Sequence, residues 1–156
     1  MKTVGSVKLV LLGIMMLLLP SGSLPSGLLG KWRVGTPYDT PNPVGITAEQ
    51  EKHIRSLEIV YSPANLHVCG KDVPIRTIEQ KSLTDDQFLQ AYGFFPHIIG
   101  MKQSPVLDLT INPSDGMNAC GDFEDPGVHV LVGRDGHVVI EVANDYLALK
   151  KEGINR

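Results

Sequence analysis

The chain has 156 residues, with 14 Lys and Arg, 17 Asp and Glu, and a formal net charge of −3 when His is neutral. This length corresponds to one ordinary domain that can bury a hydrophobic core. A mildly acidic chain without a basic run lacks the charge pattern of proteins that bind nucleic acid or anionic lipid. We therefore expect no nucleic-acid partner.

The N-terminus has the pattern of an export signal. Two lysines precede the apolar run 9–19, LVLLGIMMLLL, which is shorter than the roughly 20 residues that span a bilayer. Pro20 ends the run, and Ser21 and Ser23 put small residues where a signal peptidase needs them. We predict cleavage after Ser23, with bonds up to Gly27 as alternatives. An uncleaved membrane anchor and a buried helix are the other interpretations of the run.

Cleavage would leave residues 24–156 as a single domain without a membrane span, in the periplasm or secreted. The loss of two lysines leaves 12 basic against 17 acidic residues, a net charge of −5. The chain has only two cysteines, Cys69 and Cys120. In an exported chain this pair predicts one disulfide. The alternative, a redox or nucleophilic pair, is disfavoured because no Cys-x-x-Cys motif is present.

The first half of the domain has the pattern of strand, helix and hairpin. Residues 30–34 form a candidate strand, and the proline-rich stretch 35–45 excludes regular structure. A helix is predicted to begin at Thr47, which together with the Gln three residues later has the capping-box spacing. The segments 57–61 and 66–69 alternate between apolar and polar residues and predict a hairpin.

The second half adds another helix and more strands. A strand is predicted at 76–80, and a second helix begins at Thr84 with the same capping-box spacing and ends before Gly93. Further strands are predicted at 106–111, around Cys120, and at 128–132, 137–142 and 146–150. About eight short strands in successive hairpins predict a mainly β fold. We expect an antiparallel meander that closes into a small barrel, with two short helices.

The start of the first strand, Gly30-x-Trp32, resembles the Gly-x-Trp motif of lipocalin-type barrels. In that family the Trp closes one end of the barrel and packs against a basic residue late in the chain. Lys150, Lys151 and Arg156 are the candidates here, and the alternative is that Trp32 is an ordinary core aromatic.

The wider layout resembles small exported bacterial proteins of uncharacterised function. Their pattern is a Gly-x-Trp strand, a capped helix, a strand, a mid-chain Cys and a second capped helix ending near Tyr-Gly. Here these pieces are Trp32, 47–55, 57–61, Cys69 and 83–93. The resemblance implies a lipocalin-like fold and an exported location, and it implies no catalytic residue.

The histidines show no complete metal site. His67 and Cys69 share a strand face, and His129 and His137 flank the last predicted hairpin. A zinc site needs three or four convergent ligands, whereas the sequence shows only pairs. We therefore expect no metal and no cofactor.

Acidic residues gather in one turn-rich stretch. Oxygen-rich loops of this kind suit calcium, but the EF-hand spacing is absent, so a solvated acidic loop is the expectation. The residues are Asp115, Asp122, Glu124 and Asp125.

The segment 92–100 is apolar, carries no formal charge and contains Phe94 and Phe95. It should either fold back as core that caps the barrel or form an apolar binding lip. With Trp32, these two phenylalanines are the candidate ligand-binding residues.

Three functions remain open at this stage. The first is a non-enzymatic binding barrel that holds a small apolar ligand. The second is a protein-binding module, such as an inhibitor or immunity factor, that presents an acidic patch near 115–125 to a basic partner. The third is a hydrolase with dispersed residues in a cleft. No nucleophile motif is present, so we assign no catalytic residue and favour a non-enzymatic role.

Overall fold

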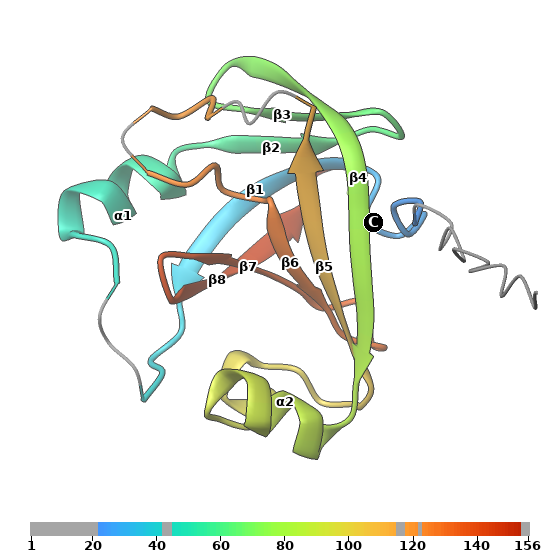
Figure 1. The fold of residues 1–156 in the computed structure, drawn as a ribbon. Coiled ribbons are helices and arrows are strands. Elements are labelled where there is room, and N and C mark those ends of the chain that lie inside the picture. The colour runs from blue at the N-terminus through green and yellow to red at the C-terminus, as the bar shows by residue number, and fades with distance from the viewer. Residues whose placement is uncertain (1–21, 42–44, 115–117, 122, 154–156) are drawn as a thin grey trace, which may run out of the picture.

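The computed structural model describes residues 22–41, 45–114, 118–121 and 123–153. Eight strands form one closed antiparallel barrel, in which each strand pairs with the next and β1 pairs with β8 (Figure 1). This architecture confirms the mainly β meander with two short helices. In chain order the elements are β1 (Gly30–Pro37), α1 (Ala48–Arg55), β2 (Glu58–Tyr61), β3 (Asn65–Val68), β4 (Lys71–Leu83), α2 (Asp85–Tyr92), the 3-10 helix η1 (Pro96–Ile99), β5 (Val106–Pro113), β6 (His129–Val132), β7 (Val138–Val142) and β8 (Asp145–Lys151).

Alternation along the strands divides the barrel into an interior and an outer face. On β6, Val130 belongs to the interior cluster, whereas its neighbour Leu131 belongs to a second cluster outside. On β7, Ile140 points inward and Val139 outward in the same way. Inward-facing side chains such as Leu109 are fully buried. The interior of this eight-stranded barrel is therefore filled by its own side chains.

One end of the barrel, the Trp32 end, is closed by a turn that precedes β1. Leu28 in this turn is fully buried, and its carbonyl accepts a hydrogen bond from Trp32 Nε1 at 2.7 Å. Lys151 Nζ lies 5.2 Å from the centre of the Trp32 ring and donates to the Gly27 carbonyl at 2.9 Å. Lys151 is thus the late basic residue that packs on Trp32, which is itself a buried core aromatic.

The opposite end, the disulfide end, is covered by α1 and by the connection between β5 and β6. Ile54 of α1 is fully buried, and Ala119 and Val128 of the connection belong to the interior cluster. The disulfide joins Cys69, after β3, to Cys120 in this connection, with a Cα–Cα distance of 5.4 Å. In Figure 1, α1 and the turn that precedes β1 lie on opposite sides of the barrel.

The stretch around Cys120 is not a strand, so that expectation was wrong. Its backbone bonds to local side chains instead of a neighbouring strand. The Asp125 carboxylate, which is 3% exposed, accepts from the amides of Ala119 at 2.7 Å and Cys120 at 2.8 Å. Asn118 Oδ1 accepts from the Gly121 amide at 3.0 Å. These hydrogen bonds take the place of the inter-strand hydrogen bonds of a sheet and fix the shape of the connection.

The helix boundaries agree with the sequence signals. Thr47 and Thr84 both form complete capping boxes, and Gly93 ends α2 with a left-handed φ of 80°. In the described ranges, no helix has the length and apolar character needed to cross a membrane.

Only part of the segment 92–100 is core, since Phe94, Pro96 and Ile99 are buried whereas Phe95 is 40% and Ile98 is 36% exposed, and the segment does not cap the barrel as expected. Phe94 and Ile99 are buried in the second cluster, against Leu131, Val139 and Tyr146 on the outer face of β6 to β8. In this way α2 and η1 cover the apolar side chains on the outer face and shield them from water.

Replacement of both cysteines (Cys69→Ala/Cys120→Ala) should lower the free energy of unfolding by about 2–4 kcal/mol, because the bond joins residues 51 positions apart. Urea unfolding of the oxidised protein and of the double variant measures this difference. A reducing agent should bring the wild type to the stability of the variant and leave the variant unchanged. Equal stability of the two oxidised proteins would contradict a stabilising role for the disulfide.

Candidate functional site

A row of polar side chains crosses the outer face of the barrel. Thr110 of β5 lies opposite His129 of β6, His129 lies opposite Glu141 of β7, and Glu141 lies opposite Tyr146 of β8. Asp108, two residues before Thr110, shares the same face of β5. We use the name polar groove for Asp108, Thr110, Asn112, Glu124, His129 and Glu141.

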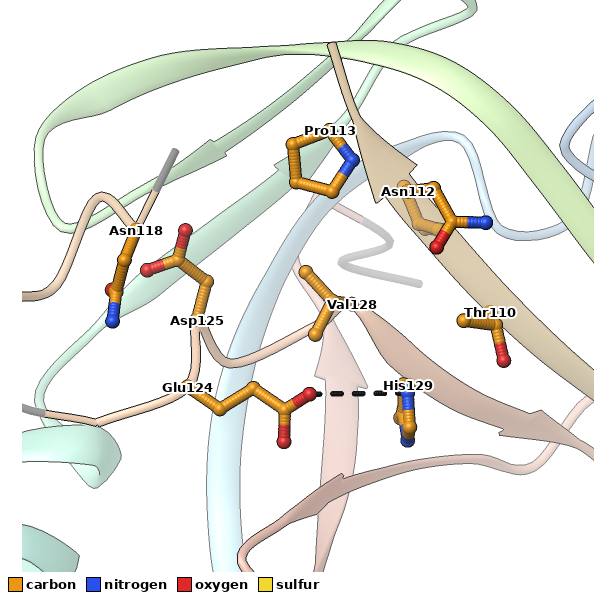
Figure 2. A pocket seen from close by; sticks show the side chains of 9 residues that line it. Thr110, Asn112, Pro113, Asn118, Glu124, Asp125, Val128 and His129 are labelled. Atoms are coloured by element: carbon orange, nitrogen blue, oxygen red, sulfur yellow. Dashed lines mark ion pairs between the residues drawn. The ribbon is translucent and has the colours of Figure 1, made fainter. Parts of the chain in front are cut away.

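Part of the polar groove is a pocket of about 240 Å³. Thr110 and Asn112 of β5 form one side, while Glu124 of the β5–β6 connection forms the other (Figure 2). Figure 2 shows the Glu124 carboxylate directed towards the His129 ring. A smaller hollow of about 20 Å³, lined by Asp108, Thr110 and two β4 residues, adjoins the pocket at Thr110. The site is therefore a pocket on the outer face with a much smaller hollow beside it.

His129 lies between two carboxylates. Its Nε2 is 3.8 Å from Glu124 Oε1, and its Nδ1 is 3.8 Å from Glu141 Oε2. The pKa of His129 is raised above 6.5, first by its interaction with Glu141, and further by the charges of Glu124 and Asp108, while partial burial opposes the rise. The neighbouring carboxylates thus favour the protonated imidazole, and the charge of the groove changes when the imidazole loses its proton.

Two tyrosines form an aromatic edge beside these carboxylates. Tyr92 of α2 and Tyr146 of β8 meet edge to face, with ring centres 6.1 Å apart. Burial and the adjacent Asp108 carboxylate raise the pKa of Tyr92, and burial followed by the charge of Glu141 raises that of Tyr146. Both hydroxyls are therefore neutral at physiological pH, and their rings border a negatively charged surface.

The chemistry of the polar groove suits a cation. The carboxylates of Glu124 and Glu141 flank a titratable imidazole, aromatic rings stand nearby, and Asp108 on the same face lies opposite Lys81 of β4. Ammonium and guanidinium groups bind to carboxylates by charge-assisted hydrogen bonds and to aromatic faces by cation–π attraction. Within the described ranges, no three or more His, Cys, Asp and Glu side chains are placed to hold a metal ion.

The groove also resembles the clustered polar residues that a hydrolase would need. Thr110 is the cross-strand neighbour of His129, and Glu141 is next to the imidazole. However, the second ring nitrogen of His129 faces Glu124 instead of the Thr110 hydroxyl. A nucleophile needs a base within hydrogen-bond reach, so this geometry favours binding over hydrolysis.

The candidate ligand residues Trp32, Phe94 and Phe95 do not line one cavity. Trp32 is buried in the interior cluster, and Phe94 is buried in the outer cluster. Phe95 is 40% exposed and stacks on His97 with ring centres 5.9 Å apart. A shared apolar cup formed by these three residues is therefore absent from the described part of the chain.

The paired residues singled out in the sequence also separate. His67 Nδ1 lies 2.8 Å from Asp72 Oδ1. The expectation that Cys69 shares a strand face with His67 was wrong, because Cys69 follows the end of β3 with a φ of 50° and forms the disulfide. His137 bonds to the Tyr38 hydroxyl at 2.7 Å, while His129 faces Glu141. Neither pair converges on a metal position.

The two acidic residues that the structure describes in this stretch, Glu124 and Asp125, differ in burial and in contacts. Asp125 is buried and fixes the backbone, whereas Glu124 is exposed and lines the pocket. Asp115 and Asp122 lie outside the described residues. Of the four acidic residues considered for calcium from the sequence, the structure describes these two, and one is buried while the other is exposed.

The polar groove as a unit was missed in the sequence. A strand was predicted at 106–111, but which strands pair with it was not. His129 and Glu141 belong to a hairpin that was predicted, so counting cross-strand pairs back from its turn would have placed them opposite each other.

No protein-family model, no curated protein and no solved structure matches the chain.

The variant Glu141→Gln should lower the pKa of His129, because it removes the carboxylate that contributes most to the rise. NMR titration of the imidazole signals measures this pKa, and Glu58→Gln on β2 is a control that should leave it unchanged.

The raised pKa of His129 also contributes to the stability of the folded protein. This contribution is fully present below pH 6.5 and is lost as pH rises through the pKa of the folded state. The pH dependence of unfolding should therefore flatten in Glu141→Gln. An unchanged pKa would show that Glu141 is not the main partner.

Proposed function

We propose that this chain is an exported, non-enzymatic binding protein that recognises a cationic group of its partner in the polar groove. The observation that carries the proposal is His129 held between Glu124 and Glu141, at 3.8 Å from each, on the open outer face of a closed barrel. The partner would present a Lys or Arg side chain or another amine.

The filled interior supports a surface site over an internal one. Trp32, Tyr61, Leu66 and Leu147, from four different strands, are all at most 4% exposed. At the disulfide end, the Tyr61 hydroxyl also donates to the Gly127 carbonyl at 3.0 Å, which ties the β5–β6 connection across the barrel. A small apolar ligand in the barrel would have to displace these side chains, whereas a cation enters the polar groove without rearrangement.

The net charge of the chain also supports a binding site for a cation. After signal cleavage the chain would have a net charge of −5, from 12 basic and 17 acidic residues. Such a charge draws cationic partners towards the protein, and the carboxylates of the groove fix where the cation binds. The proposal of export is supported by the N-terminal pattern and by the disulfide, since disulfides persist in oxidising compartments.

Titration with an acetylated triarginine peptide tests the site. We expect NMR shifts at Thr110, His129 and Glu141 in roughly 50 mM salt, and none with a triglutamate peptide. The variant Glu124→Gln/Glu141→Gln should weaken binding by about two- to fivefold for each lost carboxylate. The matched control Glu49→Gln/Glu58→Gln makes the same change of charge at exposed acids elsewhere and should weaken binding much less. Equal effects of the two double variants would show that only net charge attracts the peptide.

Affinity for the triarginine peptide should rise by a few fold as His129 loses its proton above pH 6.5, because a protonated imidazole repels the cation. Tyr92 remains neutral throughout this range, because burial and the Asp108 carboxylate raise its pKa. Binding measured from pH 6 to pH 8 checks the direction, and the rise should disappear in His129→Gln. Affinity that falls with pH would contradict the site.

A further inference from the structure

The residues directly after the predicted signal form a structured turn and not a loose leader. The Leu28 amide donates to the Pro25 carbonyl at 2.9 Å. Leu24 is 7% exposed and Leu28 is fully buried, and both belong to the interior cluster of the barrel. The turn is therefore part of the core at the Trp32 end.

The turn is also held by later parts of the chain. Trp32 Nε1 donates to the Leu28 carbonyl at 2.7 Å, and Lys151 Nζ donates to the Gly27 carbonyl at 2.9 Å. Gly22 lies against β4, since a Cβ placed there would be 3.3 Å from the Ile78 carbonyl oxygen. Strands β1 and β8 thus hold the part of this segment that follows Ser23, whereas the contact of Gly22 with β4 would be lost on cleavage after Ser23.

We infer that the peptide bond between Ser23 and Leu24 is the processing site, and that its hydrolysis precedes docking of the turn. The inference rests on the proposed export. A signal peptidase would add water across this bond, which leaves a carboxylate on Ser23 and an amino group on Leu24. Ser21 and Ser23 then occupy the two positions where the enzyme requires small residues.

Cleavage further along the chain is disfavoured by the core. A cut after Ser26 or Gly27 would remove the buried Leu24 side chain and the Pro25 carbonyl that accepts from Leu28. The barrel would then lack part of the seal beneath Trp32. The Ser23–Leu24 bond is the latest of these candidate cuts that keeps the whole turn.

The order of events follows from burial at the same bond. A peptidase binds its substrate as an exposed, extended segment, and exposed segments are where proteolysis concentrates. In the folded chain Ser23 is exposed, but Leu24 on the other side of the bond is buried in the barrel. Once the turn has docked, the bond is protected.

The first experiment exports the full chain and measures the intact mass and N-terminal sequence of the product. We expect a mature chain that begins at Leu24. A mature chain that begins at Gly27 or Leu28 would overturn the assignment while leaving export intact. Full-length chain retained inside the cell would instead contradict export, and with it the proposed function.

The second experiment tests the order of events. Purified full-length precursor is mixed with a signal peptidase in detergent, either after refolding or while still unfolded. We expect cleavage of the refolded precursor to be at least about tenfold slower, because burial protects the bond. Equal rates would overturn the order.

Chains that begin at Leu24 and at Leu28 test the role of the turn independently of the peptidase. The shorter chain should melt roughly 5–15 °C lower, because it lacks the buried Leu24. A Ser26→Ala variant of the longer chain is the control, since Ser26 is exposed. Equal melting temperatures of the two chains would overturn the claim that the core requires Leu24.

Discussion

The pairing of β1 with β8 is the constraint on which the rest of the molecule depends. It places Trp32 opposite Lys151 and Val34 opposite Leu149, so the first and last strands of the chain complete the same sheet. Closure pairs the outer edge of β1 with that of β8, so neither of these two strands is left with a free edge there. It also sets the interior volume, which the barrel's own side chains fill. The site that we propose for a partner accordingly lies on the outer face.

Local signals in the sequence predicted most of the fold. Thr47 and Thr84 lie at true helix starts because capping depends on residues only three positions apart. The hairpin that ends with Val142 was found because alternation and a glycine turn are equally local. The stretch around Cys120 was assigned wrongly for the opposite reason. Its conformation is set by Asn118 and the buried Asp125, which compete with strand pairing in a way that apolar alternation does not reveal.

The candidate site was harder to predict than the fold because it depends on distances between segments. Asp108, His129 and Glu141 come from three strands, and register alone brings them together. Glu124 arrives from a long connection whose path is fixed by the disulfide and by Asp125. The apolar segment 92–100 was recognised as unusual, but sequence could not decide which face of the barrel it would cover. The outer positions of β6 to β8 are apolar where α2 and η1 lie and polar where they do not. That division, visible only once the strands are paired, separates covered surface from candidate binding surface.

The contact of Lys151 with Trp32 and Gly27 has a practical consequence for anyone who handles the protein. It gathers the first and last described segments of the domain at the same end of the barrel (Figure 1). The β5–β6 connection and the pocket beside it lie towards the disulfide end, where β5 ends and β6 begins. An affinity tag, a fluorophore or a surface linker attached beyond either segment would therefore point away from the pocket. The described chain thus begins and ends at the Trp32 end of the barrel, whereas the candidate pocket lies towards the disulfide end.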